Sequence, residues 1–333
     1  ALTLLLLVSF SAISCFEDND DNTVSASQIN DFVWKGMNAF YLYLENSPDL
    51  ANDRFANDGA YASYLNSFSR PEDLFESLIY ERQTVDRFSW IVDDYFELER
   101  QFQGTTGTNG LEFNFYVTPD NDTNAYGIIR LVLPESPATN TELKRGDIIY
   151  GVDGTRLTRD NIGDLINKDT YTLNLGFYND NGTPDESDDS VDPLNENVTL
   201  TKVTYTEDPI FKTEVFNIGG ENIGYLMYNG FIRDSENQLN SVFSDFKANN
   251  IRQLVVDLRY NPGGSVLTTA YLASMITGQF AGEVFEKLRY NDNQSENNFD
   301  FLFYNVLPSE APVNSVGLNK VYILATGRSA SAS

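Results

Sequence analysis

Two segments of the chain carry the residues best suited to chemistry, and both are rich in small residues. Residues 257–264 read Asp-Leu-Arg-Tyr-Asn-Pro-Gly-Gly and end an apolar stretch. A Pro-Gly-Gly turn between a buried strand and a helix exposes backbone N–H groups at the helix N-terminus, where they can bind an anion or a developing oxyanion. A turn that merely connects two elements is the alternative for this segment taken alone.

The second segment lies at residues 326–333 and reads Thr-Gly-Arg-Ser-Ala-Ser-Ala-Ser, directly after the apolar run at 321–325. A serine hydroxyl in a tight turn can act as a nucleophile while the next backbone amide binds the oxyanion. A flexible Ser/Ala tail is the alternative. Because both segments follow strand-like runs of one α/β pattern, the pair favours a catalytic site more than either segment does alone.

Composition excludes several kinds of site. The 333 residues include 22 Lys+Arg and 49 Asp+Glu, and the net charge of −27 repels phosphate backbones, so we expect no nucleic-acid partner. The sequence contains no His and one Cys, which excludes Ser-His-Asp and Cys-His catalysis and a disulfide framework. It also lacks a Cys/His cluster for zinc, and we predict neither a metal nor a cofactor.

The elements that must position these segments follow from the apolar spacing. Three-and-four spacing predicts helices at 29–44, 71–79 and 90–98, so residues 25–103 form a helical region. Turn residues punctuate short β-like runs within residues 104–206, namely 113–117, 127–133, 147–152, 171–177 and 198–205. Residues 207–333 alternate strand and helix, at 223–228, 239–246, 254–258, 264–277 and 321–325.

This order predicts a multidomain fold of the α+β and α/β classes. Residues 1–24 form a leader segment with an acidic linker, and the helical, β and α/β regions follow it. Strands that alternate with helices favour a mostly parallel sheet, in which sites form beyond the carboxyl ends of the strands. The segments after residues 258 and 325 both lie at such ends, so we expect them to meet.

Residues 221–333 resemble the catalytic domain of the C-terminal processing peptidases, also called tail-specific proteases. The resemblance depends on the motifs at residues 223–226, 255–264 and 329–333. It implies a ClpP/crotonase-like fold, incomplete in this chain, and a serine enzyme that uses a Ser-Lys pair. A lysine in an apolar pocket can have its pKa lowered enough to deprotonate a serine, which agrees with the missing histidine.

The resemblance also assigns individual residues. The nucleophile loop of the family reads Thr-Ala-Ser-Ala-Ser-Glu, and its first serine attacks the substrate. Ser329 takes the place of the threonine here, which makes Ser331 the nucleophile. Ala332 then supplies one oxyanion amide and the Gly263-Gly264 turn supplies the other, with the choice between these two glycines open.

The middle region resembles a PDZ domain, which the family carries between its helical and catalytic regions. The matching motifs lie at residues 127–130, 136–138, 143–149 and 152–154. Leu111, Glu112 and Phe113 resemble the loop that binds a peptide carboxylate, although Glu112 stands where glycine is usual. A free C-terminus docks on such a loop by adding a strand to the sheet edge, and an acidic side chain beside the amides weakens its capture.

The N-terminal residues predict export. The apolar run Leu2–Val8 is shorter than the about 20 residues that span a bilayer, and it resembles the end of a signal peptide. Cys15 follows small residues and precedes an acidic run, as the acylated cysteine of a bacterial lipoprotein does. An ordinary signal peptide with an incidental cysteine is the alternative. We therefore expect a lipid-anchored protein of the bacterial cell envelope.

The expected function is that of an exported serine endopeptidase whose PDZ domain recruits or gates protein or peptide substrates. In the family the catalytic lysine follows the nucleophile by about 25 residues, which is beyond Ser333, so we expect residues 1–333 to be inactive alone. A PDZ-bearing scaffold or peptide-binding lipoprotein on a degenerate peptidase fold is the alternative. The acidic residues at 180–192 indicate a solvated insertion, with calcium binding as their alternative. The oligomeric state is not predicted.

Overall fold

The computed structural model describes residues 26–327 and 329. The chain divides into two compact units, of which one comprises the residues up to Val92 together with 287–300, and the other comprises 93–286 together with the residues from Phe301 onward. No helix among the described residues is long and apolar enough to cross a membrane. Cys15 lies outside the described residues, so its predicted acylation stays a prediction.

The first unit is helical. Its helices are α1 (Ala26–Phe40), α2 (Asp58–Leu65) and α3 (Pro71–Leu78), with short 3-10 turns η2 (Leu44–Asn46) and η3 (Pro48–Leu50). Their apolar faces enclose a core of Val33, Tyr41, Leu50, Leu65, Leu74, Phe75 and Leu78. The predicted helices at 29–44 and 71–79 are confirmed as α1 and α3, and Pro71 suits the first turn of α3 because that turn needs no N–H donor.

A segment distant in sequence completes this unit. Residues 287–300 contain the 3-10 turn η6 (Asp292–Asn297) and parts of the hairpin strands β12 (Val284–Leu288) and β13 (Phe299–Leu302). The buried Asn291 donates hydrogen bonds from Nδ2 to the carbonyl oxygens of Ala39, at 3.1 Å, and Tyr41, at 3.0 Å. Local periodicity predicts none of this hairpin, because its packing depends on side-chain contacts across about 250 residues of chain.

The second unit begins with α4 (Tyr95–Phe102). The predicted helix at 90–98 is wrong at its start, because the Asp94 side chain accepts a hydrogen bond from the Glu97 amide at 2.9 Å and begins the helix at Tyr95. A paired ribbon of β1 (Thr105–Thr108) and β8 (Val203–Thr206) follows, with Thr105 opposite Thr206. This ribbon joins the two ends of residues 104–206, which we call the β domain.

The β domain is built on one antiparallel sheet. Its strands are β2 (Leu111–Thr118), β3 (Asn121–Val132), β4 (Ile148–Val152), β5 (Thr155–Arg156), β6 (Thr170–Asn179) and β7 (Ser190–Thr201). They lie in the order β2-β3-β4-β6-β7, with β5 paired to β4. The turns η4 (Pro137–Asn140) and η5 (Glu186–Asp188) and the short helix α5 (Ile162–Ile166) connect them. The predicted β texture of this region is confirmed, and β2 forms one edge of the described sheet.

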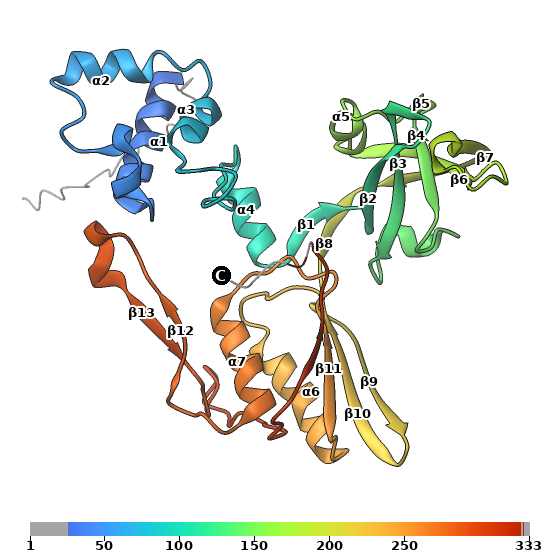
Figure 1. The fold of residues 1–333 in the computed structure, drawn as a ribbon. Helices are drawn as coiled ribbons and strands as arrows, with labels where there is room; N and C mark the ends of the chain where they lie inside the picture. Colours follow the sequence, from blue (N-terminus) through green and yellow to red (C-terminus); the bar gives the residue numbers. More distant parts are fainter. Residues whose placement is uncertain (1–25, 328, 330–333) are drawn as a thin grey trace, which may run out of the picture. The chain divides into compact units, whose positions relative to one another are not determined.

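The remaining residues of the second unit form an α/β sheet, which we call the α/β domain. Its elements are β9 (Ile210–Ile218), β10 (Glu221–Tyr228), α6 (Glu236–Ala248), β11 (Gln253–Asp257), α7 (Val266–Thr277) and β14 (Tyr322–Leu324). The strand order is β14-β11-β10-β9, with β10, β11 and β14 parallel. Helices α6 and α7 lie on the same side of this sheet (Figure 1), and their core includes Phe243, Phe246 and Met275.

The predicted alternation of strand and helix is confirmed, and the sheet is mostly parallel as expected. The exception is β9, which pairs antiparallel with β10 through the turn at Gly219 and Gly220. The carboxyl ends of β11 and β14 lie side by side, since Asp257 pairs with Leu324. This edge of the sheet therefore carries both segments that the sequence singles out.

Candidate active site

The turn after β11 is fixed by backbone contacts with Phe231. Gly263 donates no side chain to this packing, and its carbonyl oxygen accepts a hydrogen bond from the Phe231 amide at 2.9 Å, while the Ser265 amide donates to the Phe231 carbonyl at 2.7 Å. Gly264 has a φ of 132°, and a Cβ there would overlap the Phe231 carbonyl oxygen. Glycine is therefore required at this position both for its conformation and for space.

A buried asparagine determines how the amides of this turn are used. Asn261, 1% exposed, accepts a hydrogen bond at Oδ1 from the Gly263 amide at 2.7 Å and donates from Nδ2 to the Tyr228 carbonyl at 2.9 Å. The Gly263 amide is thus engaged inside the turn. Helix α7 begins directly afterwards, and Ser265 caps it by accepting from the Thr268 amide at 3.2 Å.

The segment after β14 meets this turn. The Leu258 amide donates to the Leu324 carbonyl at 2.8 Å, which extends the β11–β14 pairing by one residue. The Ser329 hydroxyl then donates to the Leu258 carbonyl at 2.7 Å, and it accepts from the Thr326 amide at 2.9 Å. The two segments therefore converge, as the sequence predicts. Ser331 and Ala332 lie outside the described residues, so their predicted roles are not tested.

An ion pair supports the base of the turn. The Arg259 guanidinium binds the Asp257 carboxylate through Nε at 2.9 and 3.0 Å and Nη2 at 2.6 Å, and the Tyr225 hydroxyl donates to the same carboxylate at 2.7 Å. Burial alone would raise the pKa of Asp257, but the hydrogen bonds from Arg259 and Tyr225 hold that pKa below its ordinary value. The expected pairing of Arg259 with Asp257 is confirmed.

The predicted carboxylate-binding loop lies at the start of the edge strand β2. Asn109, 2% exposed, accepts at Oδ1 from the Leu111 amide at 3.1 Å and donates from Nδ2 to the Tyr171 hydroxyl at 2.7 Å. The Glu112 carboxylate forms an ion pair with Arg130 at 2.6 Å. The pKa of Glu112 is raised, because the effect of burial exceeds the opposing effect of Arg130.

Phe113, the third predicted residue of this loop, packs against the core of the β domain and lies beside Phe115, with ring centroids 5.6 Å apart. The structure therefore brings Leu111, Glu112 and Phe113 together at a sheet edge. Edge position is the geometry that strand addition requires. One of the three amides expected to bind a carboxylate is already engaged by Asn109.

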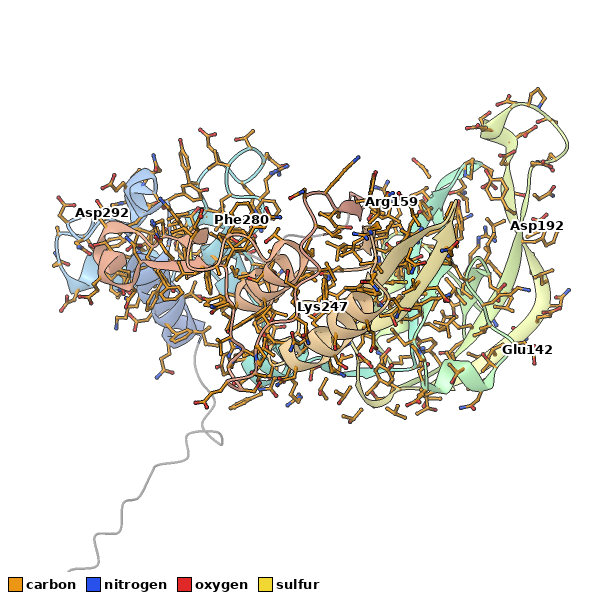
Figure 2. All side chains as sticks on the ribbon, turned by 90° about the horizontal axis from the view of Figure 1, so that it is seen from below. Glu142, Arg159, Asp192, Lys247, Phe280 and Asp292 are labelled. Atoms are coloured by element: carbon orange, nitrogen blue, oxygen red, sulfur yellow. The ribbon has the colours of Figure 1, made fainter. Side chains whose placement is uncertain are left out.

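The described lysines that form contacts do so away from the two converging segments. Lys35 pairs with Asp31 and Lys168 pairs with Asp153, in both cases near the protein surface. Lys247 lies in the last turn of α6 (Figure 2). The position of a general base is thus not assigned by the described residues.

The acidic loop between β6 and β7 satisfies its own carboxylates. The Thr183 hydroxyl donates to Asp188 at 2.9 Å, and the Tyr178 hydroxyl donates to Asp189 at 2.6 Å. Asp192 lies on β7 next to this loop (Figure 2) and accepts from the Asn179 amide group at 2.9 Å. Within the described part of the chain, no group of three or more acidic, Cys or His side chains is arranged to hold a metal.

Comparison with known protein families gives two matches, and both are to one family. Residues 222–333 match the model of peptidase family S41, and residues 28–90 match the peptidase S41 N-terminal domain. No curated protein matches the chain. The sequence signal for the N-terminal match is the helical pattern that begins near Ile29.

Two solved structures are similar to the chain. One is described as an S41 protease from Bacteroides fragilis, with 26% sequence identity and a TM-score of 0.61, covering 90% of this chain and 72% of that one. The other is a photosystem II D1 C-terminal processing protease, with 16% identity and a TM-score of 0.45, covering 93% of this chain and 76% of that one.

Proposed function

Because this chain carries two domains of peptidase family S41, we propose that it is a serine endopeptidase of the C-terminal processing type, with Ser331 as its nucleophile. The observation that carries the proposal is the hydrogen bond from Ser329 to the Leu258 carbonyl. This contact holds the start of the serine segment against the glycine turn. Ser331 follows Ser329 by two residues, so its hydroxyl lies within a short reach of the turn.

We assign the oxyanion donors to the amides of Gly264 and Ala332. The Gly263 amide already donates to Asn261, whereas Gly264 is the next residue and the last one before the cap of α7. An amide beside a helix N-terminus is a good donor to a developing negative charge, because the helix dipole adds to its field. This assignment resolves the choice between the two glycines in favour of Gly264.

In the proposed reaction the Ser331 hydroxyl oxygen attacks the peptide carbonyl carbon, and its proton passes to a general base. The resemblance implies that this base is the amine of a lysine. The oxyanion of the tetrahedral intermediate is then stabilised by the two amides, and the base returns its proton to the leaving amine. Water hydrolyses the resulting acyl-enzyme in a second step of the same kind.

The β domain is proposed to act as a PDZ domain that recruits or gates protein substrates. Support comes from the edge position of β2 and from the exposed path along it, where a peptide can add as a further strand. Export and a lipid anchor at Cys15 are proposed from the N-terminal sequence pattern. These proposals concern location and recruitment and are independent of the chemical step.

Peptide hydrolysis by the full-length gene product tests the chemical proposal. We expect Ser331→Ala to lower kcat by about 10⁴-fold or more, because the nucleophile is removed while substrate binding is kept. Ser333→Ala is the matched control and should retain activity. Full activity of Ser331→Ala would overturn the assignment, and wild-type protein that binds peptides without cleaving them would favour the alternative of a peptide-binding lipoprotein.

A further inference from the structure

The turn after β11 is anchored in the β domain through one aromatic side chain. Tyr260, 9% exposed, lies among the guanidinium groups of Arg130, Arg145 and Arg259, at 5.5, 5.6 and 5.9 Å from its ring centroid. Its ring also packs in a cluster with Leu131, Leu133 and Met227. Since Tyr260 directly precedes Asn261, its position affects where the glycine turn begins.

One of these arginines has competing partners. Arg130 forms the ion pair with Glu112 at 2.6 Å, and it also interacts electrostatically with Glu207 in the linker between β8 and β9. Glu207 is half-buried and accepts a hydrogen bond at 3.4 Å from Nδ2 of Asn229. Two carboxylates are therefore placed near a single guanidinium group, which can neutralise one of them.

Asn229 indicates how the second carboxylate is accommodated. Asn229 is 4% exposed, and its Oδ1 atom has no hydrogen-bond partner among the described residues. A buried acceptor without a donor costs free energy. A protonated Glu207 carboxyl has an O–H group that can donate to this oxygen, while its other oxygen keeps the bond from Nδ2. The orphaned acceptor is thus explained if Glu207 carries a proton.

The electrostatics agree with this geometry. Burial and the nearby Glu112 carboxylate raise the pKa of Glu207 from its ordinary 4.5 to about 7, against the lowering effects of Asn229 and Arg130. Asp208, the next residue along the linker, raises it further. Tyr205 also faces Glu207, and its own pKa is raised mainly by burial and then by that carboxylate.

We propose that Glu207 and Asn229 form a proton-binding latch that controls how firmly Arg130 holds Tyr260 and, through it, the glycine turn. With the proton bound, Glu207 is neutral, and Arg130 pairs with Glu112 beside the tyrosine ring. When the proton leaves to solvent, a second carboxylate competes for Arg130 and draws it from the ring. The turn is then held less firmly. The inference concerns this junction and holds whether or not the chain hydrolyses peptides.

The sign of the pH effect follows from the raised pKa. A carboxyl that binds its proton more tightly in the folded protein stabilises the fold while it stays protonated, and this stabilisation is lost as the pH rises from 4.5 to about 7. We therefore expect the turn to be best ordered on the acidic side of neutrality. Above that window the effect should level off.

Hydrogen exchange measured by mass spectrometry on peptides spanning residues 258–265 tests the latch. We expect protection, corrected for the intrinsic exchange rate, to fall roughly tenfold between about pH 5 and about pH 9 in the unmodified chain. Glu207→Gln mimics the protonated state and should keep the protection across the whole range. Asp208→Asn is the matched control on the same linker and should follow the unmodified chain.

A second variant keeps the test decisive if Glu207→Gln does not fold. Glu112→Gln removes the neighbouring charge and frees Arg130 for Glu207, so the midpoint of the transition should move down by about one pH unit or more. The proposal is overturned by a flat profile in the unmodified chain, by a Glu207→Gln profile that still follows it, or by an unchanged midpoint in Glu112→Gln.

Discussion

The glycine turn after β11 and the loop at the start of β2 use the same device with different consequences. In each, a buried asparagine accepts a hydrogen bond from the amide two residues later: Asn261 from Gly263, and Asn109 from Leu111. The first turn is further held by backbone bonds to Phe231 and leads into the N-terminus of a helix. The second continues as an edge strand whose next residue, Glu112, carries a negative charge.

The difference teaches how the neighbours of an asparagine brace decide what the remaining amides can bind. Beside a helix N-terminus the free amide faces a favourable field for an oxyanion. Beside a carboxylate the same kind of amide faces an unfavourable one, and Arg130 offsets it only in part. Three perturbations separate these contributions.

The largest expected effect comes from removing the brace of the glycine turn. Asn261→Ala leaves the Tyr228 carbonyl and the Gly263 amide without their buried partner, and we expect it to lower the free energy of unfolding by about 4 kcal/mol. Asn109→Ala is the matched variant and should cost about 2 kcal/mol, because the Tyr171 hydroxyl can rotate toward another acceptor. Urea denaturation measures both, and an equal cost for the two would remove the distinction between the braces.

A smaller effect is expected from the glycine that packs against Phe231. Gly264→Ala requires a strained φ and displaces the Phe231 carbonyl, so we expect a loss of about 3 kcal/mol in the free energy of unfolding. Gly146 also has a positive φ, of 98°, but no atom lies near the site of its Cβ. Gly146→Ala should therefore cost about 1 kcal/mol, as measured by thermal unfolding. Equal losses would mean that the contact with Phe231 contributes nothing.

The smallest expected effect concerns peptide binding at β2. Glu112→Gln removes the charge beside the loop amides, and we expect a peptide with a free C-terminal carboxylate to bind about fivefold more tightly. The same peptide with an amidated C-terminus should bind with unchanged affinity. Isothermal titration calorimetry on both peptides checks this, and an equal gain for the amidated peptide would show that the loop does not bind a carboxylate.

Much of the fold follows from local pattern. The helices α1 and α3, the strands of the β domain and the order of strand and helix from β10 to β14 match the apolar spacing of the sequence. The start of α4 does not, because the capping side chain of Asp94 overrides an apolar pattern that begins at Trp90. Strand β9 is missed because its half-exposed residues alternate weakly and its partner is set by the turn that follows.

The sequence by itself determined which segments carry the chemistry, since glycine, proline and serine have conformational and chemical properties that act within a few residues. It also determined that histidine takes no part. Only the tertiary structure decided that Gly263 is engaged by Asn261, that Tyr260 lies between arginines of two domains, and that Glu207 meets Asn229. These contacts join residues that the chain separates widely, and their energies depend on burial and on neighbouring charge, which appear only when the domains are packed.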